Sequence, residues 1–170
     1  MEKINFVLLP IHAKFTYQIM LVTPILADRI RGLQEARKLV SRINRKETQL
    51  VGEILLEKKS GFKSPSGDIQ NLRNSLIKDY NTLINDHSRR TLPDDDSESE
   101  ETELLTPEDL DTAVSYFSTL SRAFIYLGRY NRLDCSLNAN EAILSGYEHS
   151  VVATVFANDL KQMANDEQAI

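Results

Sequence analysis

Hydrophobic residues recur every three or four positions through most of this chain, which is the spacing of one face of an α-helix. The clearest run begins at Thr23–Pro24, where threonine is a favoured N-cap and proline a favoured first helical residue. No further proline occurs before Ser60–Gly61, and only Gly32 and Gly52 interrupt the run. The pattern predicts a long helix over about residues 24–59, with room for a break at either glycine.

A second helix is predicted over about residues 67–88. Its apolar face consists of Ile69, Leu72, Leu76, Tyr80, Leu83 and His87. The segment Ser60–Gly67, which precedes it, is rich in glycine, serine and proline, as is typical of a loop. Two amphipathic helices joined by a short loop predict an antiparallel hairpin.

The C-terminal half opens with a strong helix-start pattern. Thr106 is the expected N-cap, and Asp109 stands where a capping-box partner would be. Leu105 and Leu110 can pack together as a hydrophobic staple. An apolar stripe then continues to Gly128, a residue type that is common just after a helix end.

Two more helices are predicted after this one. A fourth covers about residues 131–144 and stops near Gly146, although Asn138 with Glu141 could restart it. The fifth carries the apolar residues Val151, Val152, Val155, Phe156, Leu160 and Met163. The only candidate strand in the whole chain is Lys3–Leu9.

These elements predict an all-α fold with about five helices. We expect a long N-terminal helical hairpin and a C-terminal three-helix unit, packed as a single bundle or as two loosely joined subdomains.

Charge divides the chain into two halves of opposite sign. Residues 1–91 contain sixteen Lys and Arg against nine Asp and Glu, whereas residues 92–170 contain four against sixteen. Asp94–Glu103 is a run of acidic residues with two serines and one threonine, and it cannot bury its carboxylates. We therefore expect a basic helical region at 1–91, an acidic disordered linker at 92–105 and a C-terminal helical region at 106–170.

Composition limits the compartment and the covalent chemistry. The single Cys135 excludes an intrachain disulfide and a zinc site built from cysteines. A reducing cytoplasm is the expected location, or the nucleus if the source is eukaryotic. The two apolar stretches before residue 28 are interrupted by polar residues and are too short to span a membrane, so no transmembrane segment is expected.

Motifs for catalysis are missing from the sequence. It contains no P-loop, no dinucleotide-binding glycine pattern, no H-E-x-x-H and no G-x-S-x-G. The histidines His12, His87 and His149 stand in separate segments without a shared spacing. We therefore expect no catalytic residue, no cofactor and no metal, and a protein that is not an enzyme.

The stretch Ser115–Tyr130 loosely resembles the first helix and turn of a tetratricopeptide repeat. The resemblance rests on Phe117, Ser121, Phe124, Gly128 and Tyr130. Leu133 and Asn140 stand where that family usually has alanine, and only one copy is present, whereas such solenoids need about three. The resemblance implies helix packing and assigns no binding residues.

The function favoured by these patterns is a non-enzymatic protein–protein interaction module, such as an adaptor, a chaperone-like protein or an assembly subunit. The candidate partner-binding residues, for another protein or a second copy, are Leu33, Val40, Ile43, Leu50 and Ile54 on the long helix. The alternative is a nucleic-acid-associated regulator whose basic face is masked by the acidic linker. That face consists of Arg37, Lys38, Arg42, Arg45 and Lys46.

Overall fold

Helices make up nearly all of the described structure, which confirms the expected all-α fold. The computed structural model describes residues 20–22, 24–61, 67–90 and 103–168 of the 170-residue chain. In chain order the elements are β1 (Met20–Val22), α2 (Pro24–Gly32), the 3₁₀ turn η1 (Leu33–Ala36), α3 (Arg37–Ser60), α4 (Gly67–Arg90), β2 (Glu103–Leu105), α5 (Pro107–Tyr130) and α6 (Ala139–Gln168). The candidate strand Lys3–Leu9 lies outside the described residues.

The first long helix is interrupted after Gly32 but continuous through Gly52. At the interruption, the Arg90 guanidinium of α4 donates a hydrogen bond of 2.8 Å to the carbonyl oxygen of Gly32. Arg90 is itself held by Asp86, 2.7 Å away on α4, and by Glu35, 3.3 Å away on η1. The end of α4 therefore satisfies a backbone acceptor where the helical geometry changes.

Side chains close the N-terminal ends of both C-terminal helices. Thr106 Oγ1 accepts from the backbone N–H of Asp109 at 3.2 Å, and the Asp109 carboxylate accepts from the Thr106 N–H at 3.1 Å. Asn138 and Glu141 exchange the same pair of bonds at the start of α6, at 2.9 and 3.0 Å. The predicted capping box and the alternative start at Asn138 are both confirmed.

Two glycines that we expected to end helices lie inside them. A Cβ atom on Gly128 would stand 3.0 Å from the Ala139 carbonyl oxygen, and one on Gly146 would stand 2.9 Å from the Ser121 carbonyl oxygen. The close approach of α5 and α6 leaves too little room for a side chain at either position, which explains both glycines. α5 continues past Gly128 to Tyr130, and its C-cap is Asn131, whose φ is 53°. The predicted fourth and fifth helices are one helix, α6, so the C-terminal region is a helical pair.

The predicted acidic linker is too long at its C-terminal end. Glu103–Leu105 forms β2, which pairs antiparallel with β1 so that Met20 stands opposite Leu105 and Val22 opposite Glu103. Backbone pairing with β1 orders this end of the segment. The rest of the linker, residues 92–102, lies outside the described residues.

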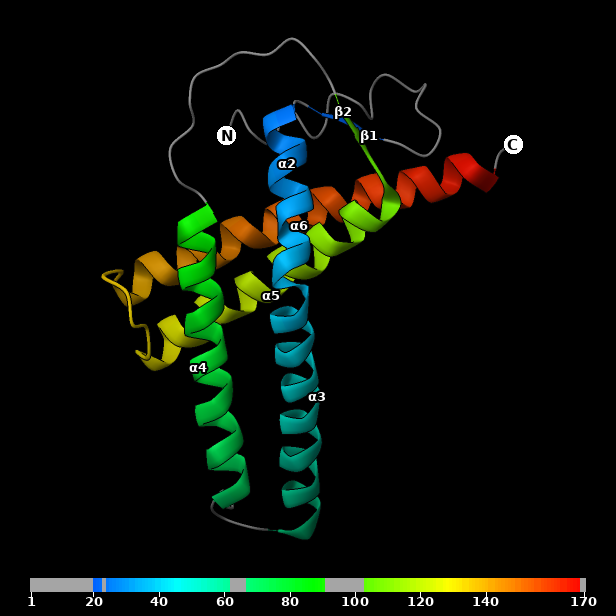
Figure 1. The fold of residues 1–170 in the computed structure, drawn as a ribbon. Helices are drawn as coiled ribbons and strands as arrows, with labels where there is room; N and C mark the ends of the chain where they lie inside the picture. Colours follow the sequence, from blue (N-terminus) through cyan, green and yellow to red (C-terminus); the bar gives the residue numbers. More distant parts are fainter. Residues whose placement is uncertain (1–19, 23, 62–66, 91–102, 169–170) are drawn as a thin grey trace.

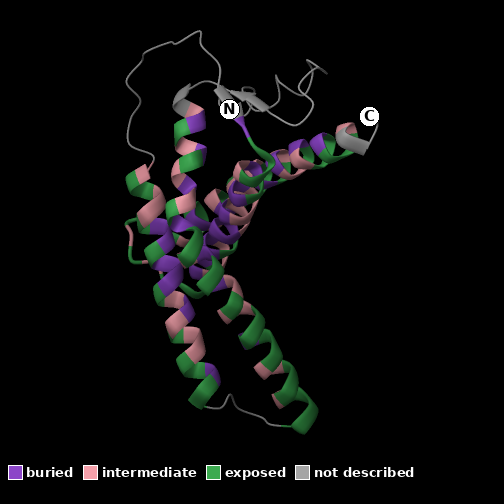
Figure 2. Ribbon diagram, turned by 45° about the vertical axis from the view of Figure 1, so that its right-hand side comes forward, coloured by how far each residue is buried: buried purple, intermediate pink, exposed green. Residues whose placement is uncertain are grey.

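The helices pack as two crossing pairs. α2, η1 and α3 follow one another as a nearly straight rod with α4 beside α3, and α5 and α6 lie side by side across them (Figure 1). Because α5 contacts both α3 and α4, the two pairs form one bundle. Figure 2 shows buried residues gathered at the crossing, while the far end of the α3–α4 hairpin is mostly exposed.

Candidate functional site

The apolar strip of the first long helix belongs to the core of the chain. Its members Leu33, Val40, Ile43 and Leu50 are buried, and Ile54 is half-buried against the core. We expected these residues to bind a partner. The structure instead uses them internally, because α4 and α5 both pack against α3.

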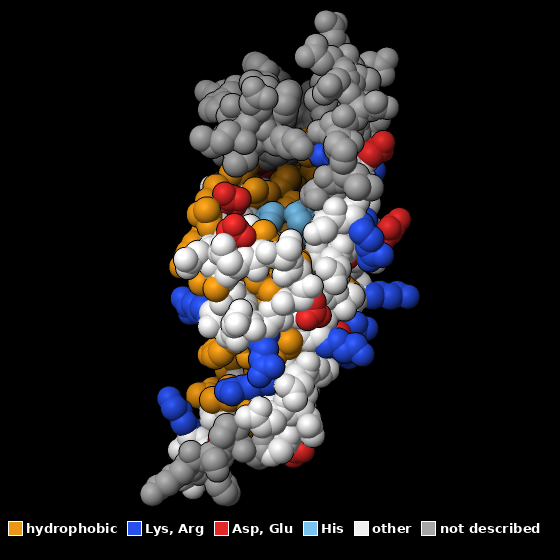
Figure 3. Space-filling view, turned by 90° about the vertical axis from the view of Figure 1, so that its left-hand side faces the viewer, with side chains coloured by type: hydrophobic (Ala, Val, Ile, Leu, Met, Phe, Trp, Pro, Cys, Tyr) orange, Lys and Arg blue, Asp and Glu red, His pale blue; other side chains and the backbone are white. Residues whose placement is uncertain are grey.

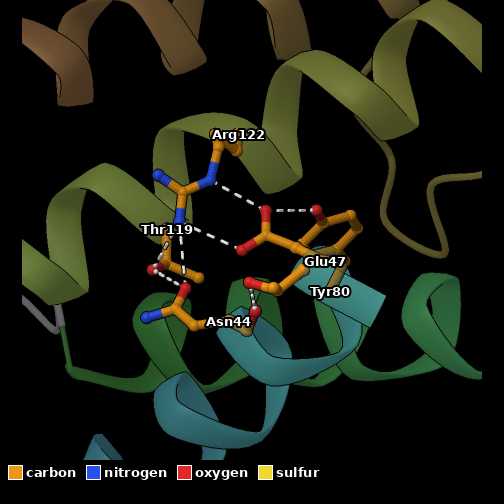
Figure 4. A network of polar contacts seen from close by, with 6 residues as sticks. Asn44, Glu47, Tyr80, Thr119 and Arg122 are labelled. Atoms are coloured by element: carbon orange, nitrogen blue, oxygen red, sulfur yellow. Dashed lines mark hydrogen bonds and ion pairs between the residues drawn. The ribbon is translucent and has the colours of Figure 1, made fainter. Parts of the chain in front are cut away.

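A polar network lies on this strip at Glu47, where an apolar residue would be expected (Figure 4). The Tyr80 hydroxyl and the Arg122 Nε each donate to Glu47 Oε2 at 2.8 Å. Arg122 also donates to Asn44 Oδ1 at 3.0 Å, and so does the Thr119 hydroxyl at 3.1 Å. Burial, followed by the Glu47 charge, raises the pKa of Tyr80. The network connects α3, α4 and α5.

Part of the predicted basic face is neutralised by a buried carboxylate. Asp79 of α4 is 6% exposed and pairs with Arg42 at 3.0 Å and with Lys46 at 2.6 Å. Burial alone would raise the pKa of Asp79, but the hydrogen bonds and positive charges of Arg42 and Lys46 together outweigh burial and lower that pKa. Arg42 and Lys46 are therefore committed to the packing of the hairpin.

The remaining basic residues lie on open surface. Arg37 pairs with Glu108 of α5 at 3.1 Å, with both side chains more than half exposed. Lys38 and Arg45 are exposed and make no ion pair with any described residue. Two of the five predicted basic residues thus have no ion-pair partner within the described part of the chain.

The outward face of α6 carries an uncharged stripe that sequence analysis missed. Its members are Asn140, Leu144, Tyr147, Val151, Thr154 and Asn158, all exposed, and we call them the α6 seam. The steps alternate between four and three residues, which is how residues that face a partner helix are spaced in a coiled coil. Leu144, Tyr147 and Val151, the apolar centre of the seam, are 59%, 54% and 54% exposed.

A second group of exposed apolar side chains lies near the end of α3. Val51, Leu55 and Leu56 are 57%, 54% and 62% exposed. The last turns of α3, to which they belong, are mostly exposed (Figure 2). This group is shorter than the α6 seam and is followed by Lys58 and Lys59.

A cavity of about 470 Å³ opens where α2, α4, α5 and α6 meet. Most of its wall is apolar, and Figure 3 shows histidine side chains in pale blue among hydrophobic ones on this face. The lining residues are Leu26, Asp28, Arg29, Ile30, Gly32, Leu33, His87, Arg90, Phe117, His149, Val152, Val155 and Phe156. We call this space the histidine cavity.

Aromatic rings form a column beside the histidine cavity. Phe156 stacks on Phe117 at 5.8 Å and 15°, and Phe117 stacks on His149 at 5.9 Å and 25°. Phe124 stacks on His149 from α5 at 5.4 Å and 21°. His87 meets His149 edge-on, with ring centroids 4.8 Å apart. The column fixes the orientation of both imidazoles.

Both imidazoles are neutral at neutral pH. Burial, followed by the nearby His149 and Arg90, lowers the pKa of His87 to about 4, while Asp86 opposes this in part. Burial also lowers the pKa of His149. Nδ1 of His87 lies 3.3 Å from the Tyr116 hydroxyl. A neutral imidazole offers one hydrogen-bond donor and one acceptor.

Asp159 is a buried carboxyl on the same side of α6 as Phe156, one turn further on. It is 2% exposed, and neither of its oxygens has a hydrogen-bond partner among the described residues. Burial raises the pKa of Asp159 to about 7. Burial therefore favours the protonated carboxylic acid over the charged carboxylate.

Two other kinds of site are absent from the described part of the chain. No three His, Cys, Asp or Glu side chains of these residues come together as a metal site. None of the helices described above is long and apolar enough to cross a membrane.

Comparison with known proteins yields no significant match, whether with protein families, with curated proteins or with solved structures. The resemblance of Ser115–Tyr130 to a tetratricopeptide repeat therefore rests on those residues alone. The α6 seam and the histidine cavity are the features that bear on function.

The α6 seam could have been found from the sequence, but the histidine cavity could not. The spacing of Leu144, Tyr147 and Val151 is visible in the sequence once Gly146 is kept inside a helix. The two histidines come from α4 and α6, and only the helix crossing brings them together.

Proposed function

We propose that this protein is a non-enzymatic helical interaction module that binds a helix of a partner protein along the α6 seam. The observation that carries the proposal is the run of exposed, uncharged, heptad-spaced residues on α6. Large apolar side chains that are more than half exposed and aligned on one helix are typical of an interaction surface.

The energetics favour a lengthwise helix contact. Burial of a large apolar side chain contributes about 1.5–3 kcal/mol of binding free energy. Leu144, Tyr147 and Val151 together can therefore offset part of the entropic cost of association. The two ends of the seam, with Asn140 on one side and Thr154 and Asn158 on the other, are polar. Polar residues in such a seam specify the register of the partner helix at some cost in affinity.

The nucleic-acid alternative has less support. Phosphate binding needs cations that are free to contact the backbone. Arg42 and Lys46 are held by Asp79, and Arg37 faces Glu108. We place the interaction in the cytoplasm or nucleus, where the free Cys135 remains reduced.

The test is a double substitution, Leu144→Asp with Val151→Asp. Because both side chains are exposed, the variant should fold, with an unchanged far-ultraviolet circular dichroism spectrum. Partner capture from the native host, quantified by mass spectrometry, should fall by at least about tenfold, since each buried carboxylate costs several kcal/mol. Sedimentation of the pure protein shows whether the partner is a second copy.

The matched control is Leu55→Asp with Leu56→Asp, which places the same charges on the other exposed apolar group. It should leave capture unchanged. Capture that survives the α6 substitutions but is lost in the α3 control would contradict the proposal and move the interface to the hairpin.

A further inference from the structure

The histidine cavity has the properties of a small-molecule site, and its position is separate from the α6 seam. Its volume of about 470 Å³ lies within the range of about 300–1,000 Å³ that is common for ligand pockets. Its wall is mainly aliphatic and aromatic, with a few polar groups that converge from the three helices α2, α4 and α6. Such a combination is what a specific pocket requires.

We propose that the histidine cavity binds a planar, uncharged aromatic molecule that carries one hydrogen-bonding group. The aromatic column supports this shape. Phe117, His149 and Phe156 all line the cavity, and their rings are within 25° of parallel where they stack. A flat ring placed against them would gain stacking contacts in addition to the burial of its apolar surface.

The two imidazoles support the hydrogen-bonding group. His149 makes ring contacts with Phe117, Phe124 and His87, and no described residue hydrogen-bonds to it. Because a neutral imidazole has both a donor and an acceptor nitrogen, His149 can serve a hydroxyl, an amine N–H or a carbonyl group. The ligand would thus be oriented by a single polar contact in an apolar wall.

The charges around the cavity support an uncharged ligand. Three charged side chains line it: Asp28 is exposed, Arg29 beside it carries the opposite charge, and Arg90 is engaged by Asp86, Glu35 and the Gly32 carbonyl. A charged ligand would therefore lose its hydration against an apolar wall, and the opposite charges of the adjacent Asp28 and Arg29 would compensate little of that loss. An uncharged molecule meets no such penalty.

The test uses N-phenyl-1-naphthylamine, an uncharged aromatic probe with one N–H group, whose fluorescence rises in apolar surroundings. We expect saturable binding of one probe per chain. In a His12→Gln background, which leaves two histidines, the imidazole ¹⁵N signals of His87 and His149 should both shift on binding. Failure to saturate, or saturation without a shift of either histidine, would overturn the proposal.

Two substitutions at one lining residue give an independent check. Val155→Trp fills the cavity and should weaken probe binding by about tenfold or more, equivalent to about 1.4 kcal/mol. Val155→Ala leaves the cavity open and should stay within about threefold of wild type. Equal probe affinity in the two variants would count against the site. If the Trp variant does not fold, the imidazole ¹⁵N shifts of His87 and His149 test the proposal instead.

This inference stands apart from the proposed function. Leu144→Asp with Val151→Asp should leave probe affinity unchanged while it abolishes partner capture. The Val155 variants, in turn, test the cavity without altering the exposed seam.

Discussion

Ser121 of α5 donates a hydrogen bond of 2.6 Å to the backbone carbonyl oxygen of Gly146 in α6. The two helices approach so closely here that a Cβ on Gly146 would stand 2.9 Å from the carbonyl oxygen of Ser121 and would also meet the Ile125 side chain. The absence of a side chain at Gly146 therefore determines how α6 lies on α5.

We predict that Gly146→Ala lowers the free energy of unfolding by about 1–3 kcal/mol, since the added methyl group overpacks the helix contact. Gly52→Ala is the matched control, because Gly52 is also inside a helix and a methyl group there would meet no neighbouring element within 4 Å. That change should raise stability by about 0.5–1 kcal/mol through better helix propensity. Urea unfolding measures both, and equal effects would contradict the close contact.

The Tyr80–Glu47 hydrogen bond should contribute measurably to stability. Tyr80 is 3% exposed, and its hydroxyl bonds a charged carboxylate at 2.8 Å. Tyr80→Phe should therefore cost about 1.5–3 kcal/mol, the usual value for a hydrogen bond to a charged group. The exposed Tyr147→Phe should stay within about 0.5 kcal/mol of wild type. Thermal or urea unfolding of the two variants checks the difference.

Local patterns predicted most of the helices because their determinants are close in sequence. The capping box of Thr106 and Asp109 and the helix over residues 67–90 each depend on residues within a few turns. The prediction at Gly146 was wrong because glycine also ends helices, and only the approach of Ser121 explains it here. Glu47 interrupts the apolar strip, and its partners Tyr80 and Arg122 lie on other helices.

The candidate sites were harder to predict from the sequence than the helices, because they depend more on tertiary structure. Burial converted the predicted binding strip, including Val40 and Ile43, into core because amphipathic periodicity does not tell which partner covers a face. The cavity arises where His87 and His149 meet at a helix crossing. No local spacing encodes that meeting.

Asp159 should make the protein less stable as the pH rises from about 4 to about 7. Its pKa is raised from the ordinary 3.8 to about 7, so the folded state binds a proton that the unfolded state releases. The resulting contribution to the free energy of unfolding is complete below about pH 4 and is lost as the pH rises toward 7. It amounts to about 1.4 kcal/mol for each unit by which the pKa is raised.

Asp159→Asn keeps the shape of the protonated acid and cannot ionise. Relative to wild type, we expect the variant to gain about 1 kcal/mol or more of stability between about pH 5 and pH 8, as measured by urea unfolding at both values. A constant difference between the two proteins across this range would show that Asp159 titrates normally.

His87 should impose the opposite pH dependence. Its pKa of about 4 lies below the ordinary 6.5, so protons bind preferentially to the unfolded chain. Its contribution is complete above about pH 6.5 and is lost as the pH falls toward 4. Among the described residues, His149 and Arg90 lower the pKa of His87, and Asp86 raises it.

The Asp159→Asn background exposes the histidine effect, because the two pH dependences oppose each other in the wild-type protein. In that background, stability should rise with pH between 4 and 6.5, and the imidazole signals of His87 should titrate near pH 4 by nuclear magnetic resonance. A midpoint near 6.5 would mean that water reaches the imidazole freely. The apolar wall of the histidine cavity would then not exclude water, and the desolvation that keeps both imidazoles neutral would be lost.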